Sequence, residues 1–521
     1  MAGSETMTRY QTDKSGTREA RGVLQLGVGT TKSAKGKAVL MTSRESDKLI
    51  VARKPGNAGG AKGLTRIRGD ARDRIPGLGT GIRFTTQLAS LTLRARRGKK
   101  YRFTSLMHLI TEDSLKACFR DLAQNKAPGI DKVTMAEYEA NLDENVKHLL
   151  VRLKARTYRP QPVKRVSIPK PNGQQRPLGI PAVEDKVVQM ACKKILEAIF
   201  EVDFLDVSYG FRPKRGCHDA LDDLDRTIMC ENVNYVVDLD IERFFDTVDH
   251  HWLLECLRQR IKDTAFLGLI VRFLDAGAIS EGKYLATTEG TPQGSVLSPI
   301  LANIYLHFIL DLWFELRVKK RLKGYSRLIR YADDFVVCFE YEWEAKGFVN
   351  VLRKRLSKFG LKIAEAKSRL IEFGRYPWAK AKRLGKRLET FDFLGFTHYC
   401  DRTRTGWFKL GRRTARTRLN RTLTGINDWL RRVRNLVRLE QWWPVLTAKL
   451  RGVYNYYGIS GNLRSLQTIR HRTIGLAFKW INRRSQRRSY RPDQYQRWLK
   501  YHPLPEPRIY HGYPVLTRKC S

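Results

Sequence analysis

The chain has 521 residues, of which 42% are hydrophobic, so its size allows about three domains with cores of their own. Its 98 lysine and arginine residues outnumber 52 aspartate and glutamate residues, which gives a formal net charge of +46. This excess is larger than solubility needs and favours a polyanionic partner, because phosphate neutralisation dominates nucleic-acid binding. Half of the excess lies in residues 401–521, where 28 basic residues stand against 5 acidic ones.

Cysteine spacing and apolar runs exclude several other classes of protein. The eight cysteines include no C-x-x-C pair, which argues against a zinc ribbon or a disulfide framework and favours reduced thiols. No apolar run approaches the ~18 residues that cross a membrane, so we expect no membrane partner. The first residues carry charges and no apolar core, unlike a secretory signal.

The first half of the chain begins with a basic segment and continues with helices and a hairpin. Residues 1–80 are rich in Gly, Lys, Arg, Ser and Thr, which predicts a mostly disordered basic arm. Apolar residues at helical spacing between 115 and 122 predict a helix. The pair Asn172-Gly173 lies between two short extended runs, which predicts a hairpin. A helix with one apolar face is predicted over 184–204.

The second half predicts a strand, a long helix, a hairpin and a basic helical region. "YVVDLD" at 235–240 reads as a buried strand, followed by a turn and an amphipathic helix. "TPQG" then enters a long apolar helix. "RLIRY" and "FVVCFE" predict a second hairpin that bends near 332–334. Beyond residue 400 the pattern is helical and basic, with one apolar stripe from Leu419 to Leu436.

Two carboxylate clusters carry the strongest chemical signal. Asp238 and Asp240 share a face of one predicted strand, and Asp333 and Asp334 interrupt the second hairpin. Strands far apart in sequence can be neighbours in one sheet, and carboxylates meeting at its edge would repel unless Mg²⁺ bound there. Two-metal nucleotidyl transfer needs such a site. Each cluster alone could be solvated turn aspartates, but two clusters in so basic a chain favour catalysis.

Eight segments together resemble the ordered blocks of a reverse transcriptase. In chain order they are KAPGIDKVT, IPKPNGQQRPLGIP, SYGFRP, DIERFFD, TPQGSVLSPILANIYL, YADD, AEAKSRL and FDFLGFTHY. The closest resemblance is to the reverse transcriptase/maturase encoded within bacterial group II introns, over roughly residues 100–500. No H-N-H endonuclease signature follows, so we expect a member that lacks this domain.

The resemblance implies an α+β, right-hand polymerase. Fingers and a palm with an antiparallel sheet would be followed by an α-helical thumb, or X domain. The implied domains are a basic, disordered arm over 1–80, an N-terminal extension and fingers over 81–233, a palm over 234–400, a helical thumb or maturase domain over 401–490 and a basic tail over 491–521.

The resemblance also implies roles for individual residues. Asp240, Asp333 and Asp334 would be catalytic and hold two Mg²⁺ ions together with the backbone carbonyl of Ile241. Asp238 would be structural or a helper, while Asp246 and Asp249 would cap or orient the next helix. The residues expected to bind the dNTP are Lys170, Arg176, Phe245, Gln293, Gly294 and Lys367. The residues expected to bind RNA are Arg212, Arg412, Arg413, Arg416, Arg431, Arg432, Arg434, Arg483 and Arg484.

Two of these residues keep an alternative interpretation. Phe245 falls where an aromatic ring would exclude a 2′-hydroxyl, but its spacing is equally typical of a core residue beside Phe244. Arg212 could contact template or triphosphate, or it could form a structural ion pair. The sequence leaves both choices open.

The implied activity is RNA-directed DNA synthesis by two-metal nucleotidyl transfer. The protein would bind its parent group II intron RNA, assist splicing as a maturase and copy the RNA into DNA for intron mobility. Its partners would be intron RNA, template–primer, target DNA and dNTPs, in a bacterial cytoplasm near the nucleoid or a ribonucleoprotein. The alternatives are an RNA-binding splicing factor with a vestigial polymerase and a domesticated host or defence reverse transcriptase.

Overall fold

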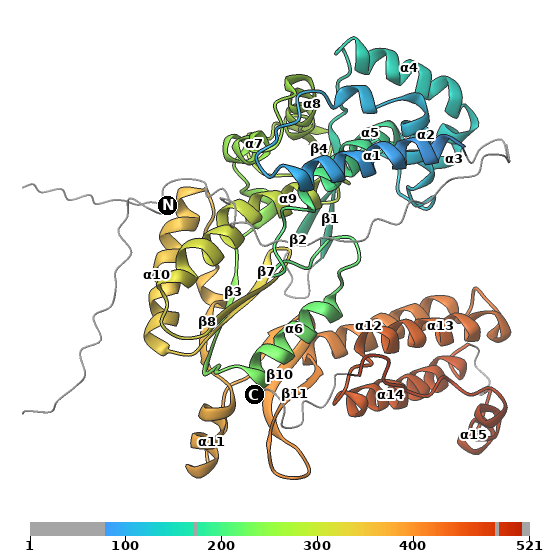
Figure 1. The fold of residues 1–521 in the computed structure, drawn as a ribbon. Helices are drawn as coiled ribbons and strands as arrows, with labels where there is room; N and C mark the ends of the chain where they lie inside the picture. Colours follow the sequence, from blue (N-terminus) through green and yellow to red (C-terminus); the bar gives the residue numbers. More distant parts are fainter. Residues whose placement is uncertain (1–78, 170–174, 485–488, 513–521) are drawn as a thin grey trace, which may run out of the picture. The chain divides into compact units, whose positions relative to one another are not determined.

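The computed structural model describes residues 79–169, 175–484 and 489–512, which form an α+β fold (Figure 1). The predicted α+β class is thereby confirmed. The predicted arm over 1–80 lies outside the described residues, apart from residues 79 and 80, where α1 begins. The helices before the central sheet are α1 (Gly79–Arg97), α2 (Glu112–Arg120), α3 (Met135–Ala140), α4 (Leu142–Lys154), α5 (Val183–Phe200) and α6 (Cys217–Cys230).

Three sheets lie in the described part of the chain. The first has the order β2-β1-β4-β5, and β1 and β2 form the antiparallel hairpin that the sequence predicted. The central sheet has the order β6-β7-β3-β8, and the third has the order β11-β10-β9. The strands are β1 (Val163–Pro169), β2 (Gln175–Ile180), β3 (Tyr235–Asp240), β4 (Ala278–Ser280), β5 (Lys283–Leu285), β6 (Ser326–Tyr331), β7 (Asp334–Phe339), β8 (Arg369–Glu372), β9 (Phe391–Phe393), β10 (Phe396–Arg402) and β11 (Phe408–Thr414).

The central sheet is buried on both faces, which explains why β7 is apolar throughout. Phe335 and Val337 pack into one hydrophobic cluster, while Val336 and Cys338 pack into another on the opposite face. Helices α9 (Ser298–Leu306) and α10 (Glu342–Lys358) contribute to the first cluster, and α6 contributes to the second. Charged groups are therefore tolerated only at the ends of these strands or where a partner is built in.

The long apolar helix predicted after "TPQG" runs over Ser298–Arg321. By length and composition it could cross a membrane, but 83% of its apolar window is buried inside the fold, so it is a core helix here. It includes two π-helical turns, His307–Asp311 and Phe314–Val318. The remaining helices of this region are α7 (His250–Arg258) and α8 (Thr264–Leu274).

The C-terminal region is helical and has a hydrophobic cluster of its own. The predicted apolar stripe packs into this cluster from Leu419 to Val433, but Leu436 is 79% exposed, because α12 has ended before it. The helices that follow β8 are α11 (Arg375–Arg383), α12 (Arg416–Val433), α13 (Leu439–Tyr457), α14 (Leu463–Ile481) and α15 (Pro492–Tyr501).

The predicted domain limits stay predictions, although two of them cut structural units. Residue 400 lies inside β10, and the first C-terminal helix begins only at Arg416. The predicted tail over 491–521 includes α15, whose Tyr495 is buried in the C-terminal cluster. Six of the described cysteines are free, as the expectation of reduced thiols requires, whereas Cys230 is disulfide-bonded and departs from it.

Candidate active site

The carboxylates meet at one edge of the central sheet. β3 and β7 are antiparallel, and their register sets Asp240 directly opposite Asp334. A two-residue turn, Ala332 and Asp333, joins β6 to β7, and Ala332 has a left-handed φ of 58°. Because strand alternation stops at this turn, two adjacent carboxylates can occur in a strand-forming run. The fold thus brings Asp240 together with the 333–334 pair, as the sequence predicted.

Burial and the charges of neighbouring carboxylates raise the pKa values of Asp333 and Asp334. Burial is the main cause that raises the pKa of Asp334 to about 7, and the carboxylates of Asp238 and Asp333 add to it. Burial also raises the pKa of Asp333, and the charge of Asp240 raises it further. A bound cation would relieve this repulsion and favour the ionised acids, so the electrostatics suit a cation site.

The donor set fits a divalent cation, because Mg²⁺ prefers oxygen ligands and these donors are carboxylates. In residues 79–169, 175–484 and 489–512, however, no group of three or more His, Cys, Asp and Glu side chains is gathered as a metal site. Asp240 pairs with the Lys367 ammonium instead, and Asp238 pairs with Arg369 at 3.3 Å. Ile241 is buried and bridges to Ile363. The two-ion site, and the role of the Ile241 carbonyl as one of its ligands, stay predictions.

A fully buried arginine, which the sequence reasoning missed, holds the turn that carries Asp333. Arg330 donates two hydrogen bonds to the Asp311 carboxylate, at 2.7 and 2.6 Å, and one to Asn303 Oδ1 at 3.1 Å. It also donates to the Ala332 carbonyl at 2.9 Å and to Ser208 Oγ at 2.7 Å. All three guanidinium nitrogens of Arg330 donate in these bonds, and the bond to the Ala332 carbonyl fixes the turn.

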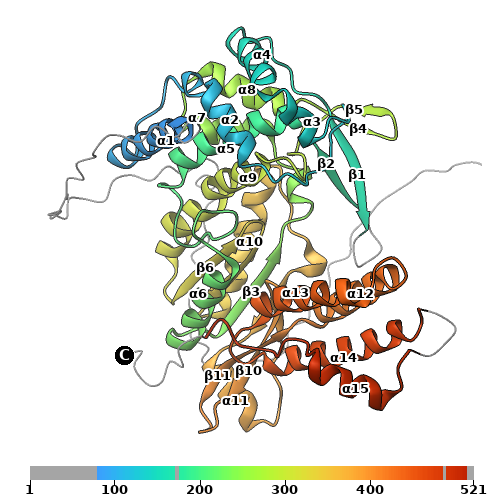
Figure 2. The ribbon, with the colours of Figure 1, turned by 90° about the vertical axis from the view of Figure 1, so that its right-hand side faces the viewer.

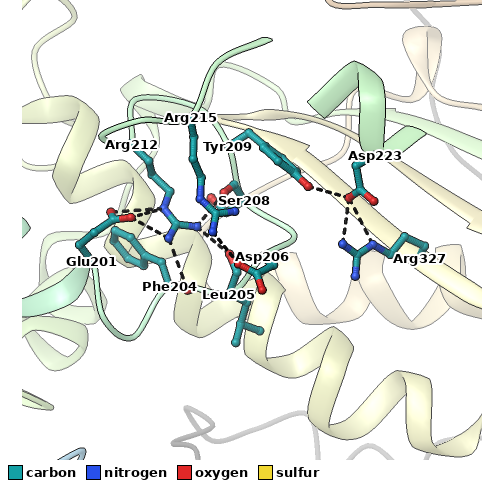
Figure 3. Close-up of polar contacts among 10 residues, drawn as sticks. All are labelled: Glu201, Phe204, Leu205, Asp206, Ser208, Tyr209, Arg212, Arg215, Asp223 and Arg327. Carbon is teal, nitrogen blue, oxygen red and sulfur yellow. Dashed lines mark hydrogen bonds and ion pairs between the residues drawn. The ribbon is translucent and has the colours of Figure 1, made fainter. Parts of the chain in front are cut away.

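The loop that supplies Ser208 is itself fixed by arginine pairs (Figure 3). Arg212 donates to both oxygens of Glu201 and to the carbonyls of Leu205 and Ser208. Gly210 lies so close to the turn that a Cβ there would overlap the Ala332 nitrogen. The backbone of this loop therefore packs directly against the turn formed by Ala332 and Asp333.

Two arginines that were predicted to bind RNA are instead structural. Arg212 is buried and its guanidinium is committed to Glu201 and to backbone carbonyls, so the ion-pair alternative holds. Arg412 is also buried and pairs with Asp225 of α6, 187 residues away in sequence. Neither guanidinium is available to a phosphate, and the prediction of RNA contacts for them is wrong.

The other predicted RNA-binding arginines lie on or near the surface of the C-terminal region. Arg413, Arg416, Arg431, Arg432 and Arg483 are exposed. The Arg434 guanidinium stacks on Trp480 at 4.7 Å, and Arg484 is half-buried. One further arginine was not predicted: the charge of Arg418 in α12 offsets part of the rise in the pKa of Asp334, so it lies within electrostatic reach of this carboxylate.

A pocket of about 210 Å³ lies between the β1–β2 hairpin and the segments 243–246 and 287–293, and two of the predicted nucleotide-binding residues line it. Phe245 and Gln293 line it, together with two arginines that were not predicted, Arg165 and Arg243. The Phe245 ring also packs edge-to-face on Phe244, so it has both a core contact and a surface in the pocket.

The backbone around this pocket needs a glycine. Gly294 has a φ of +105°, and a Cβ there would lie 2.6 Å from the Gly179 carbonyl oxygen. The neighbouring Gln293 carbonyl accepts a 2.6 Å hydrogen bond from the Gly179 amide. Gly294 thus permits a close approach between the "TPQG" turn and β2.

Arg176, the predicted arginine of the β1–β2 hairpin, interacts electrostatically with one of the carboxylates. Arg176 of β2 is exposed, and its charge offsets part of the rise in the pKa of Asp333. Lys170, predicted to act with it, lies outside the described residues. Asp249 accepts a 3.0 Å hydrogen bond from the Trp252 amide and caps α7, which confirms the capping role expected for it.

Comparisons with known proteins agree with this geometry. Residues 168–398 match the family model described as "Reverse transcriptase (RNA-dependent DNA polymerase)". Protein YkfC of Escherichia coli K12 is 36% identical over 272 residues, which cover 45% of this chain and 70% of YkfC. The chain belongs to the reverse transcriptase family and carries an RNA-dependent DNA polymerase domain.

Within that family, the relatives include intron proteins. The group II intron-encoded protein LtrA of Lactococcus lactis subsp. cremoris is 40% identical over 219 residues, which cover 42% of this chain and 36% of LtrA. Nuclear intron maturase 1, mitochondrial, of Arabidopsis thaliana is 36% identical over 92 residues, or 17% of this chain and 12% of the maturase. The chain thus spans about a third of LtrA, and the resemblance to group II intron proteins is confirmed over that part.

We expect Asp311→Ala to lower the free energy of unfolding by about 3–5 kcal/mol, because it leaves the buried Arg330 charge without its carboxylate. Glu342→Ala is the matched control, since it breaks the exposed Lys346–Glu342 pair and should cost less than about 1 kcal/mol. Urea denaturation followed by circular dichroism measures both. Equal losses for the two variants would contradict the role assigned to the buried pair.

We expect Gly294→Ala to destabilise the protein by about 1–3 kcal/mol, because it combines a left-handed φ with a Cβ that meets the Gly179 carbonyl. Gly268→Ala serves as the control, since Gly268 lies within α8 and a Cβ there meets nothing within 4 Å. That change should stabilise the protein by about 0.5–1 kcal/mol. Thermal melts of the two variants should therefore shift in opposite directions.

Proposed function

We propose that this protein is a group II intron reverse transcriptase that copies RNA into DNA. The observation that carries the proposal is the register of the central sheet, which sets Asp240 opposite Asp334 and next to the turn that holds Asp333. The protein would also bind its parent intron RNA, assist its splicing and use the DNA copy for intron mobility. The names of the relatives, intron-encoded protein and intron maturase, support this choice.

In this proposal the chain works as a right-hand polymerase with a palm, fingers and a helical thumb. Asp240, Asp333 and Asp334 hold the cations, with the Ile241 carbonyl as a further ligand. When bound, two Mg²⁺ ions would activate the primer 3′-hydroxyl and stabilise the charge on the transferred phosphate. Lys367 would leave its pair with Asp240 and meet the incoming nucleotide.

The nucleotide would enter by the pocket that Phe245 and Gln293 line. Arg176 and Lys170 would neutralise the triphosphate, for which the arginine fork is well suited. The ring of Phe245 would lie under the sugar and exclude a 2′-hydroxyl. Gln293 and Gly294 would contact the template or nucleotide through the turn, where the absence of a Cβ permits close approach.

The exposed arginines of the C-terminal helices would grip the phosphates of folded RNA, whose recognition relies mainly on shape and backbone contacts. The residues that keep this role are Arg413, Arg416, Arg431, Arg432, Arg434, Arg483 and Arg484. The proposed partners are intron RNA, template–primer, target DNA and dNTPs. The proposed location is a bacterial cytoplasm, where these partners meet.

We expect Asp240→Asn and Asp333→Asn to abolish primer extension while RNA affinity stays within a few-fold, because each change removes a metal-binding charge and leaves the RNA surface intact. Asp249→Asn is the matched control: asparagine caps a helix as well as aspartate does, so extension should persist. Extension and filter-binding assays on the same preparations measure both quantities. Loss of RNA affinity together with extension would refute the assignment, and extension that survives Asp333→Asn would indicate another polymerase in the preparation.

We expect the double change of Arg431 and Arg432 to Gln to lower the slope of log affinity against log salt for a folded group II intron RNA by about 1.5, since each phosphate contact contributes 0.7–0.9. Arg226 and Arg258 provide the control pair, because each is exposed and already paired with an acid on its own helix. An unchanged slope in the Arg431/Arg432 variant would remove this helix from the RNA interface.

A further inference from the structure

A short helix between the central and third sheets carries uncompensated positive charge. α11 and the turn after it place six exposed cations between residues 375 and 387, and no acidic residue occurs from Gly374 to Arg387. These cations are Arg375, Lys380, Lys382, Arg383, Lys386 and Arg387. In the described parts of the chain, the last five form no ion pair with an acid. Cations elsewhere on the surface, such as Lys346 and Arg353, are paired with glutamates.

The helix is fixed to the fold along one side only. Pro377 and Ala381 are buried one turn apart, and the Trp378 ring packs 5.7 Å from Phe408 of β11. Its N-terminus is anchored at Gly374, where a Cβ would overlap the Val233 carbonyl. The opposite, charged side of the helix is thereby held in a fixed orientation toward solvent.

Large apolar side chains are exposed among these cations. Tyr376 is 62% exposed and Leu384 is 59% exposed. Trp407, also 62% exposed, lies in the turn between β10 and β11 with the exposed Arg404, and the exposed Arg402 ends β10. Figures 1 and 2 both show α11 beside this hairpin. Exposed rings in a field of cations are the combination that binds unpaired bases, because each base stacks while its phosphate is neutralised.

This surface lies at the far end of the central sheet from the carboxylates. β8 pairs Glu372 with Tyr235, the first residue of β3, whereas Asp240 is the last residue of that strand. The strand between them spans about 17 Å. Because α11 begins just after β8, its N-terminus lies at the opposite end of β3 from Asp240, away from the edge where the carboxylates meet.

We propose that α11 and the β10–β11 turn form a second RNA-binding surface, which holds an unpaired segment of the same RNA away from the catalytic edge. The inference rests on the proposed function for the choice of RNA as partner. Folded RNA offers unpaired bases in its loops and bulges, which aromatic and arginine side chains bind by stacking. The α11 surface would anchor such a loop while the catalytic edge works on another part of the strand.

The charge test uses the full-length protein with Lys380, Arg383 and Lys386 changed to Gln. For a uridine homopolymer RNA, the slope of log affinity against log salt should fall by about 2, because each phosphate contact on a single strand contributes about 0.7. The control changes Lys346, Arg353 and Lys354 of α10 to Gln, which removes the same charge from a helix where Lys346 and Arg353 have glutamate partners. The control should keep the wild-type slope. An α11 slope equal to that of wild type, or equal losses in both variants, would overturn the proposal.

The stacking test uses Tyr376→Ala, which should weaken binding of the same RNA about tenfold and leave binding to a blunt RNA duplex unchanged. Trp343→Ala is the control, since Trp343 is an exposed aromatic residue flanked by acids on α10. Loss for the duplex as well, or loss for a deoxyuridine homopolymer equal to that for the RNA, would overturn the assignment to unpaired RNA. All four variants should keep primer extension on a short preannealed template–primer. If wild type itself does not extend, the proposed function fails, while the binding measurements still decide this inference.

Discussion

The buried ion pair between Arg330 and Asp311 is the constraint on which the candidate active site depends. Asp311 ends a π-helical turn in a core helix, and Arg330 lies in the strand that leads into the turn holding Asp333. An isolated charge in either place would cost several kcal/mol, so each residue requires the other. Through its bonds to Ser208 and the Ala332 carbonyl, the pair joins the core helix, the arginine-tied loop and the turn into one unit. The position of Asp333 follows from that unit and not from the hairpin alone.

The central sheet solves a conflict between burial and charge. Both of its faces are covered, so its strands have to be apolar, yet the chemistry needs several carboxylates within reach of one another. The fold confines the carboxylates to the end of the sheet, where β3 stops and β7 starts. Even there, burial raises the pKa of Asp334 to about 7, and the charges of Asp238, Asp333 and Asp240 raise it further. A bound cation would offset the repulsion among these carboxylates.

Local patterns made much of the fold predictable from the sequence. The strand ending at Asp240, the hairpin around the 333–334 pair and the cap at Asp249 each depend on neighbouring residues, which a sequence displays. The buried arginines could not be assigned in this way. Arg412 meets Asp225 across 187 residues, and nothing local distinguishes it from the exposed Arg413 beside it. Arg330 did leave a signal, since a charged residue in an apolar strand requires a partner, but the identity of that partner depended on the tertiary fold.

The arginines named here consequently serve two different roles: some are buried in ion pairs that stabilise the fold, and others are exposed and can attract phosphate. Arg212, Arg330 and Arg412 are buried against Glu201, Asp311 and Asp225, so their charges are neutralised within the fold and contribute little to the field outside. The net charge of +46 is a total, and it does not show where on the surface the positive charge is concentrated. It is concentrated where acids are absent, as on α11, because an exposed cation without a nearby acid keeps its full attraction for phosphate. A polyanion would accordingly be attracted to the faces that carry exposed cations without acidic neighbours. The buried arginines contribute little to this attraction, because their charges are neutralised by acids inside the fold.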